Sequence, residues 1–238
     1  MKYKHGYQIG WYQKYVKRLI DIVLSFGAIV ILSPIILLTA FMVRLNIGSP
    51  VIFKQQRPGE NEKIFMMYKF RSMTDKKGAD GKLLPDEERL TRFGKKLRAS
   101  SLDELPELFN ILKGDMSIVG PRPQLVRDMV FMSDEQRKRH TVKQGLTGLA
   151  QVSGRNDITW EKKLKLDIQY IENVSFCRDF MIIMKTIEKV LKREGICSGE
   201  MATAEDYGDY LLRTGRITAD EYDEKMMLAR SLIKHGGK

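Results

Sequence analysis

The sequence is poor in cysteine and histidine: its 238 residues include two Cys and three His. Cys177 and Cys197 cannot build a disulfide framework, and so few Cys and His side chains leave no ligand set for a Cys/His zinc site. Seven prolines and 19 glycines exclude a collagen-like or linker-like chain, and 43% hydrophobic residues exclude a disordered one. These absences indicate a folded protein in a reducing compartment.

Acidic residues are also in deficit, with 30 Asp and Glu against 41 Lys and Arg and a formal net charge of +11. Such a charge points to polyanionic partners, meaning nucleic acid, anionic lipid or phosphorylated substrates. We discount nucleic acid because the sequence contains no recognised nucleic-acid-binding motif and because its basic residues flank a long apolar segment.

That apolar segment runs from Ile22 to Val43 without a charged residue. At about 1.5 Å per residue it is long enough to cross a hydrocarbon core of about 30 Å. It is too long for a secretory signal peptide, and no small-residue cleavage site follows it. Two interpretations remain, a membrane-spanning helix and a bent helix that returns to the same side.

Ser33 and Pro34 favour the bent helix. Proline in mid-helix removes a backbone hydrogen bond and kinks the helix, which leaves two arms that each reach about half the bilayer. Both flanks are basic, and the positive-inside rule then places both on the cytoplasmic side. We therefore predict a membrane anchor at residues 1–47 with a re-entrant helix. The basic flanking residues are Lys14, Lys17, Arg18, Arg44, Lys54, Arg57 and Lys63.

The rest of the chain predicts a mostly α fold with a small β element. Two β-prone runs, 51–53 and 64–70, predict a small hairpin, and helical spacing begins near Glu87. Gly114 is expected to end the helix that follows Ser101. Further helices are predicted at 124–132, 134–140 with Ser133 as its cap, 160–173 and 176–193. The last is amphipathic, which fits either the membrane interface or packing on the core.

The C-terminal part predicts two helices joined at Thr214 and Gly215, the second capped by Thr218 with Glu221. Their apolar residues are too few to fold alone, so the pair should dock on the catalytic domain or on a second copy of the chain. We favour docking near a subunit interface. The predicted organisation is therefore an anchor at 1–47, a cytoplasmic catalytic domain at 48–200 and a helical hairpin at 201–238.

The densest chemical signal lies at residues 98–123, around Asp103 and Glu104. Ser101 and Glu104 have the spacing of a capping box, which is the structural interpretation. The functional interpretation is that two carboxylates at an open helix start hold a divalent cation such as Mg²⁺ against substrate phosphates. Cations would take the remaining phosphate oxygens. The candidate phosphate contacts are Lys69, Arg71, Arg98, Arg122 and Arg155.

Several long motifs in this chain resemble the bacterial sugar transferase family, the monotopic phosphoglycosyl transferases. The resemblance covers roughly residues 14–195. It places the Ser-Pro kink of the family on Ser33 and Pro34, and its Asp-Glu dyad on Asp103 and Glu104. The matching motifs are KRLIDIVLSFGAIVILSPIILL, VIFKQQRPG, IFMMYKFRSM, TRFGKKLRASSLDELPELFNILKGDMSIVGPRP and GLTGLAQVSGRNDITWEKKLKLDIQYIEN.

The resemblance implies an Mg²⁺-dependent enzyme that transfers a phosphosugar from a UDP-sugar to polyprenyl phosphate. Asp103 would be the nucleophile of a ping-pong reaction through an aspartyl-phosphosugar, and Glu104 would orient the metal or handle a proton. The enzyme would lie on the cytoplasmic face of the bacterial inner membrane and contact membrane lipids. It would also be able to form a homo-oligomer. The alternative is a non-catalytic membrane adaptor whose basic face binds anionic lipids. A carboxylate pair inside a basic surround argues for the enzyme.

Overall fold

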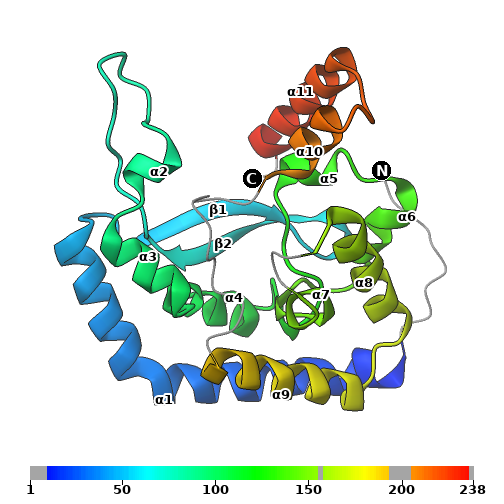
Figure 1. Cartoon of the computed structure of the whole chain (residues 1–238). Coiled ribbons are helices and arrows are strands. Elements are labelled where there is room, and N and C mark those ends of the chain that lie inside the picture. Colours follow the sequence, from blue (N-terminus) through cyan, green and yellow to red (C-terminus); the bar gives the residue numbers. More distant parts are fainter. Residues whose placement is uncertain (1–9, 155–157, 193–204, 236–238) are drawn as a thin grey trace.

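The computed structural model describes residues 10–154, 158–192 and 205–235, which form a mostly helical chain with two small sheets (Figure 1). The N-terminal helix α1, Lys17–Asn46, follows a π-helical turn at Tyr12–Val16. Together they form one stretch that is long and apolar enough to cross a membrane. The strands are β1 Ile52–Pro58, β2 Ile64–Phe70, β3 Ser117–Val119 and β4 Gly145–Thr147.

Helix α1 bends where the sequence places Ser33 and Pro34 within it. The helix remains continuous, and Figure 1 shows it running along the base of the molecule and then turning upward. Proline lacks the N–H that would bond to the carbonyl of Val30, four residues earlier. The Ser33 hydroxyl donates to that carbonyl at 2.8 Å. The Ser-Pro pair therefore bends the helix while keeping the freed backbone oxygen hydrogen-bonded.

Strands β1 and β2 form the predicted antiparallel hairpin, with Ile52 opposite Phe70 and Pro58 opposite Ile64. Strand β1 is longer than the expected 51–53 because it includes the polar run up to Pro58. That run has no β pattern of its own, and the partner strand holds it extended. Strands β3 and β4 pair in parallel beside it as a second sheet.

The predicted capping box at Ser101 and Glu104 is wrong. Ser101 has a left-handed backbone (φ 55°) and its side chain makes no capping hydrogen bond. The segment Leu102–Glu104 is a 3-10 turn, and helix α4 begins only at Glu107, after Pro106. A serine with positive φ does not have the extended backbone that lets an N-cap side chain reach the following amides. The predicted end at Gly114 is confirmed, with φ 99°.

The remaining helices mostly follow the predicted pattern. The capping box of Ser133 and Gln136 is present, whereas the helix expected at 124–132 is shortened to four residues. The bounds are α2 Asp86–Arg89, α3 Arg92–Ala99, α4 Glu107–Lys113, α5 Val126–Met129, α6 Asp134–Arg137, α7 Leu149–Val152, α8 Trp160–Glu172, α9 Phe176–Lys192, α10 Tyr207–Arg213 and α11 Ala219–His235. Short 3-10 turns lie at Glu60–Glu62 and Lys138–Thr141.

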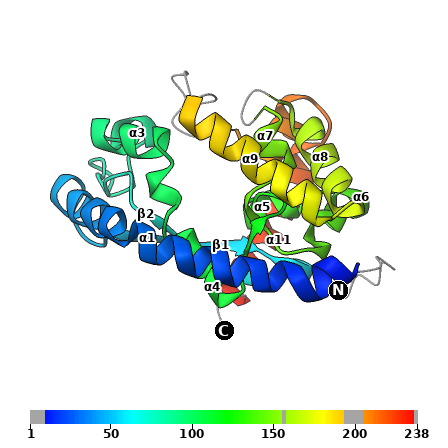
Figure 2. The same ribbon diagram turned by 90° about the horizontal axis from the view of Figure 1, so that it is seen from below.

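Helix α9 and the first part of α1 lie on the same face of the molecule (Figures 1 and 2). The apolar stripe of α9 points outward, since Phe176, Phe180 and Ile187 remain 48–55% exposed. On the inward side, the buried carboxylate of Asp179 accepts hydrogen bonds from Lys17 Nζ at 2.5 Å and from Tyr170 at 2.8 Å. This contact fixes α9 against α1, and both helices present apolar side chains to the outside.

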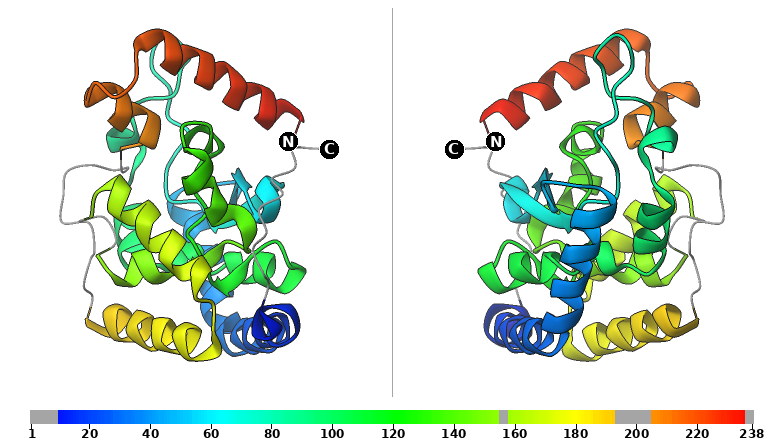
Figure 3. Two further views of the ribbon diagram at one scale, coloured as in Figure 1. Left: turned by 90° about the vertical axis from the view of Figure 1, so that its right-hand side faces the viewer. Right: turned by 90° about the vertical axis from the view of Figure 1, so that its left-hand side faces the viewer.

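Helices α10 and α11 dock on the opposite side of the molecule from α9 (Figure 3). Of the two docking partners that we expected, the structure shows the rest of the same chain, and the Thr218 and Glu221 capping box is present. The expected subunit interface stays a prediction. The shared core consists of Val130, Phe131, Met132, Trp160, Leu164, Tyr207, Leu211 and Ala229.

Candidate active site

The carboxylate of Glu104 lies between two cations from distant parts of the chain. Lys69, on β2, places its Nζ 2.9 Å from Glu104 Oε1. Arg122, just after β3, places Nη2 2.7 Å from the same oxygen. Strand β2 and the turn after β3 therefore converge on the 3-10 turn at Leu102–Glu104, and Glu104 is held in one position.

Asp103 has a different environment from its neighbour. The residue is 8% exposed, and its carboxylate forms no hydrogen bond or ion pair with the part of the chain that the structure describes. The two members of the dyad therefore differ. Glu104 is fixed by cations, whereas the carboxylate of Asp103 has no such partner among the described residues.

The pKa values of the dyad differ in the same direction. Burial and then the negative charge of Glu104 raise the pKa of Asp103, which comes to about 6 against the opposing effect of Lys69 and other nearby cations. Burial also raises the pKa of Glu104, but Arg122 and Lys69 outweigh it and hold that pKa well below its usual range. Glu104 is therefore ionised under all physiological conditions, and Asp103 titrates close to them.

A third carboxylate, Glu107, belongs to this site and was missed from the sequence. It lies in the first turn of α4, is 2% exposed and places Oε1 3.1 Å from Lys69 Nζ. Burial raises the pKa of Glu107 to about 7, with Lys69 opposing the shift. Its position four residues after Asp103 was the available signal, because side chains with that spacing would share a face of the helix that the sequence predicts from Ser101. In the structure Asp103 lies instead in the 3-10 turn that precedes α4.

The other candidate phosphate contacts divide into two groups. Arg98, on α3, donates to Ser72 Oγ at 2.9 Å and is close enough to lower the pKa of Asp103. Arg71 instead donates to the carbonyls of Met73 and Ser49, so the structure does not bring it to the dyad. Arg155 lies outside the described residues.

Two arginines hold the turn that carries Arg122: Arg139, which is buried and which the sequence did not single out, and Arg57, which is half-buried and which the sequence placed only among the basic flanking residues. Arg139 Nη2 donates to the Arg122 carbonyl at 2.6 Å, and Arg57 Nη1 donates to the Pro123 carbonyl at 3.2 Å. Gly120 begins this turn because a Cβ there would lie 2.4 Å from the carbonyl oxygen of Lys143. The backbone at 120–123 is thus fixed by close packing and by two guanidinium groups.

The residues at the dyad fit a divalent cation of the Mg²⁺ type. Mg²⁺ is commonly held by one or two carboxylates together with water and substrate phosphates, and it does not require a full protein cage. The free carboxylate of Asp103 and the second oxygen of Glu104 are hard oxygen donors of this kind. Over the described ranges no cluster of three or more metal-ligating side chains occurs, so the remaining ligands would come from substrate or water.

A family model described as bacterial sugar transferase matches residues 12–193. This chain belongs to the bacterial sugar transferase family. The match includes α1, both sheets and α9, together with the dyad and its cations. Helices α10 and α11 lie beyond the part of this sugar transferase that the family model matches.

Individual sugar transferases support the same assignment. The chain is 50% identical over 192 residues to the uncharacterized sugar transferase EpsL of Bacillus subtilis (strain 168), covering 81% of this chain and 95% of EpsL. It is 38% identical over 200 residues to the undecaprenyl-phosphate galactose phosphotransferase of Salmonella typhimurium, covering 76% of this chain and 42% of that protein. A third relative is the UDP-glucose:undecaprenyl-phosphate glucose-1-phosphate transferase of Klebsiella pneumoniae, 40% identical over 183 residues and covering 73% and 39%. The chain spans less than half the length of the last two relatives.

Proposed function

We propose that this sugar transferase moves a phosphosugar from a UDP-sugar to polyprenyl phosphate, giving UMP and a polyprenyl-diphosphate-sugar. The observation that carries the proposal is the free, buried carboxylate of Asp103 beside a Glu104 that two cations hold. The names of the Salmonella and Klebsiella relatives describe transfers to undecaprenyl phosphate, which supports the same acceptor class.

In the proposed reaction, an oxygen of Asp103 attacks the phosphorus that carries the sugar, and the bond from that phosphorus to the UMP oxygen breaks. UMP leaves with the electron pair. A phosphate oxygen of the polyprenyl acceptor then attacks the same phosphorus and releases Asp103. Lys69 and Arg122 offset the charge on the phosphate oxygens. Bound Mg²⁺ would supply further charge neutralisation of the diphosphate.

Glu104 suits metal holding better than proton transfer in this scheme. A general acid or base needs a pKa near the working pH, and the cations around Glu104 keep its pKa far below that range. Its carboxylate is therefore a permanent negative charge. Such a charge can hold a cation beside Asp103 through both half-reactions.

We propose that α1 is re-entrant and that the first part of α1 and α9 rest at the membrane surface. The bend at Pro34 and the outward apolar side chains of both helices support this arrangement. It would hold the dyad at the level of the acceptor's phosphate. An apolar groove of about 480 Å³ beside Pro106, close to the dyad, could take the first isoprene units. The groove is lined by Ile36, Ala40, Val51, Ile52, Lys54, Tyr68, Phe70, Pro106 and Phe109.

Release of UMP tests the proposed function. The purified protein in nanodiscs with Mg²⁺ should release UMP from at least one member of a UDP-sugar panel, covering glucose, galactose and their N-acetylated amines. Release should stop near one equivalent without polyprenyl phosphate and continue with it, as a ping-pong mechanism requires. The adaptor alternative predicts no UMP release from any donor, together with vesicle binding that rises with the fraction of anionic lipid.

The pH dependence follows from the raised pKa of Asp103. The attacking species is the carboxylate, so kcat/KM for the donor should fall as the pH drops through about 6, where an ordinary aspartate would titrate near 4. Replacing Glu104 with Gln removes a negative charge that raises this pKa. In Glu104→Gln, the residual kcat/KM should therefore begin to fall only at a lower pH than in the wild type. A wild-type kcat/KM that falls only near pH 4 would contradict the assignment of Asp103 as the attacking carboxylate.

The re-entrant topology predicts that both ends of α1 face the cytoplasm. In a chain with Cys177 and Cys197 replaced by serine, single cysteines at Gly10 and Asn61 should both react with a membrane-impermeant thiol reagent from the cytoplasmic side only. Labelling of the two positions from opposite sides would show a full span. Pro34→Ala should shift molecules toward that spanning state because it restores the hydrogen bond to Val30 and straightens the helix.

A further inference from the structure

The hairpin of α10 and α11 contacts the segment that carries Arg122, although it lies outside the part matched by the family model. The link is Asp128, in α5, which is 2% exposed. Its Oδ2 accepts from the backbone N–H of Leu125 at 2.9 Å, and its Oδ1 accepts from the backbone N–H of Tyr207 at 2.9 Å. One buried carboxylate therefore joins the start of α5 to the start of α10.

A second link is electrostatic. Asp206 forms an ion pair with Arg127, next to the Asp128 contact. Several charges lie near this contact: burial, the charge of Arg122 and the smaller effect of Arg127 lower the pKa of Arg57 to about 10, against the opposing effect of Asp128 and Glu107. Asp206 therefore offsets a positive charge that would otherwise repel Arg57.

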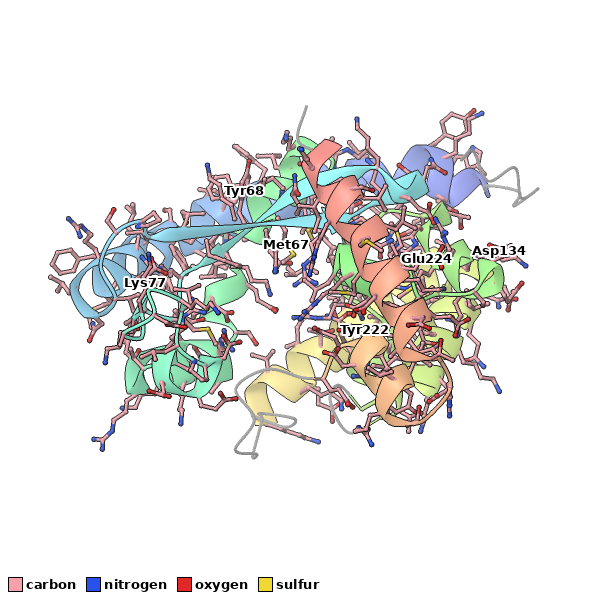
Figure 4. The ribbon with its side chains drawn as sticks, turned by 90° about the horizontal axis from the view of Figure 1, so that it is seen from above. Met67, Tyr68, Lys77, Asp134, Tyr222 and Glu224 are labelled. Atoms are coloured by element: carbon pink, nitrogen blue, oxygen red, sulfur yellow. The ribbon has the colours of Figure 1, made fainter. Side chains whose placement is uncertain are left out.

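Packing fixes the hairpin at the same place. Gly208 lies so close to Phe131 that a Cβ would be 2.4 Å from the ring, and Trp160 donates to the carbonyl of Glu205 at 3.1 Å. The ring of Tyr222, on α11, stacks on Phe131 with 5.5 Å between centroids. Figure 4 looks down on α11 and shows Tyr222 on the side of the molecule formed by α5 and α8.

The segment 120–128 is thus held from two directions. Arg57 and Arg139 bind its carbonyls from the part of the chain that the family model matches, and Tyr207 binds its end from the hairpin. We infer that Asp206 and Tyr207 are positioning residues that keep Arg122 in place at Glu104 and so set the affinity for the donor's diphosphate. The inference rests on the proposed function, and it assigns the C-terminal hairpin a role in donor binding.

Substitutions in the hairpin can separate positioning from general stability. Gly208→Val should push α10 away from Phe131 and break the bond between Tyr207 and Asp128. The matched control is Leu211→Ala, which leaves a cavity in the same core but keeps that bond. In steady-state UMP release at saturating acceptor, we expect KM for the donor to rise about tenfold in Gly208→Val, with kcat changed less than about twofold. In Leu211→Ala the melting temperature should fall and the donor KM should stay at the wild-type value.

A charge exchange tests the second link and does not depend on how well Gly208→Val folds. Arg127→Glu and Asp206→Arg should each raise the donor KM, and the double variant should return it toward wild type because the ion pair is restored in reverse. The inference is overturned if the donor KM of Gly208→Val equals that of Leu211→Ala at similar melting temperatures, or if the charge exchange gives no recovery. If the wild-type protein releases no UMP from any donor, the proposed function fails first and the inference fails with it.

Discussion

The variant Asp103→Asn is expected to lose turnover by about a million-fold, the scale seen when a covalent nucleophile is removed. An amide of the same shape cannot attack the phosphorus, so no aspartyl-phosphosugar forms. The fold should survive, because the Asp103 carboxylate makes no hydrogen bond or ion pair with the described residues. The free energy of unfolding should change by only about 0.5 kcal/mol. The measurements are UMP release and retention of a radiolabelled sugar on the denatured protein.

Glu87→Gln is the matched control for this experiment, since it removes one carboxylate from the exposed side of α2. It should keep wild-type turnover and labelling. Near-normal turnover in Asp103→Asn would exclude Asp103 as the nucleophile. A labelled sugar that remains on Asp103→Asn would move the covalent step to another residue.

Features that depend on neighbouring residues could be predicted from the sequence. The Ser33 and Pro34 bend, the stop at Gly114 and the Ser133 cap all involve contacts within four residues. The sequence around Ser101 has the same local pattern, but its capping hydrogen bond does not form. The side chain of Glu104 that would complete it is bound instead by Lys69 and Arg122, which lie 35 and 18 residues away in the sequence. Long-range ion pairs outweigh the local motif here.

The site could be predicted only in part for the same reason. Asp103 and Glu104 are adjacent in the chain, so this pair of carboxylates can be recognised from the sequence without knowledge of the fold. Lys69 and Arg71 are two residues apart and both carry a positive charge, yet one reaches Glu104 and the other binds the carbonyls of Ser49 and Met73. No sequence pattern separates them. Arg139 was missed because its role depends on a buried partner, Asp167, 28 residues away.

Replacing Asp167 is expected to have the largest effect on the stability of the fold. Arg139 is fully buried, and Asp167 Oδ2 accepts from its Nε at 2.9 Å. Asp167→Asn leaves a guanidinium charge buried without its counter-ion, which should lower the free energy of unfolding by about 3 kcal/mol. Denaturant unfolding in detergent micelles measures this change in the free energy of unfolding. Glu188→Gln, which breaks the exposed pair with Lys192 on α9, is the control and should show no measurable change.

A double variant separates the two roles of Arg139. Replacing the pair by apolar residues, Arg139→Met with Asp167→Leu, removes both buried charges and should recover much of the stability that Asp167→Asn loses. It removes the hydrogen bond from Arg139 Nη2 to the Arg122 carbonyl, which Asp167→Asn keeps, so the donor KM of the double variant should be higher than that of the wild type. Recovered stability together with a wild-type donor KM would show that Arg139 does not position Arg122. Failure to recover stability would show that this core needs the ion pair itself, because packing alone does not replace it.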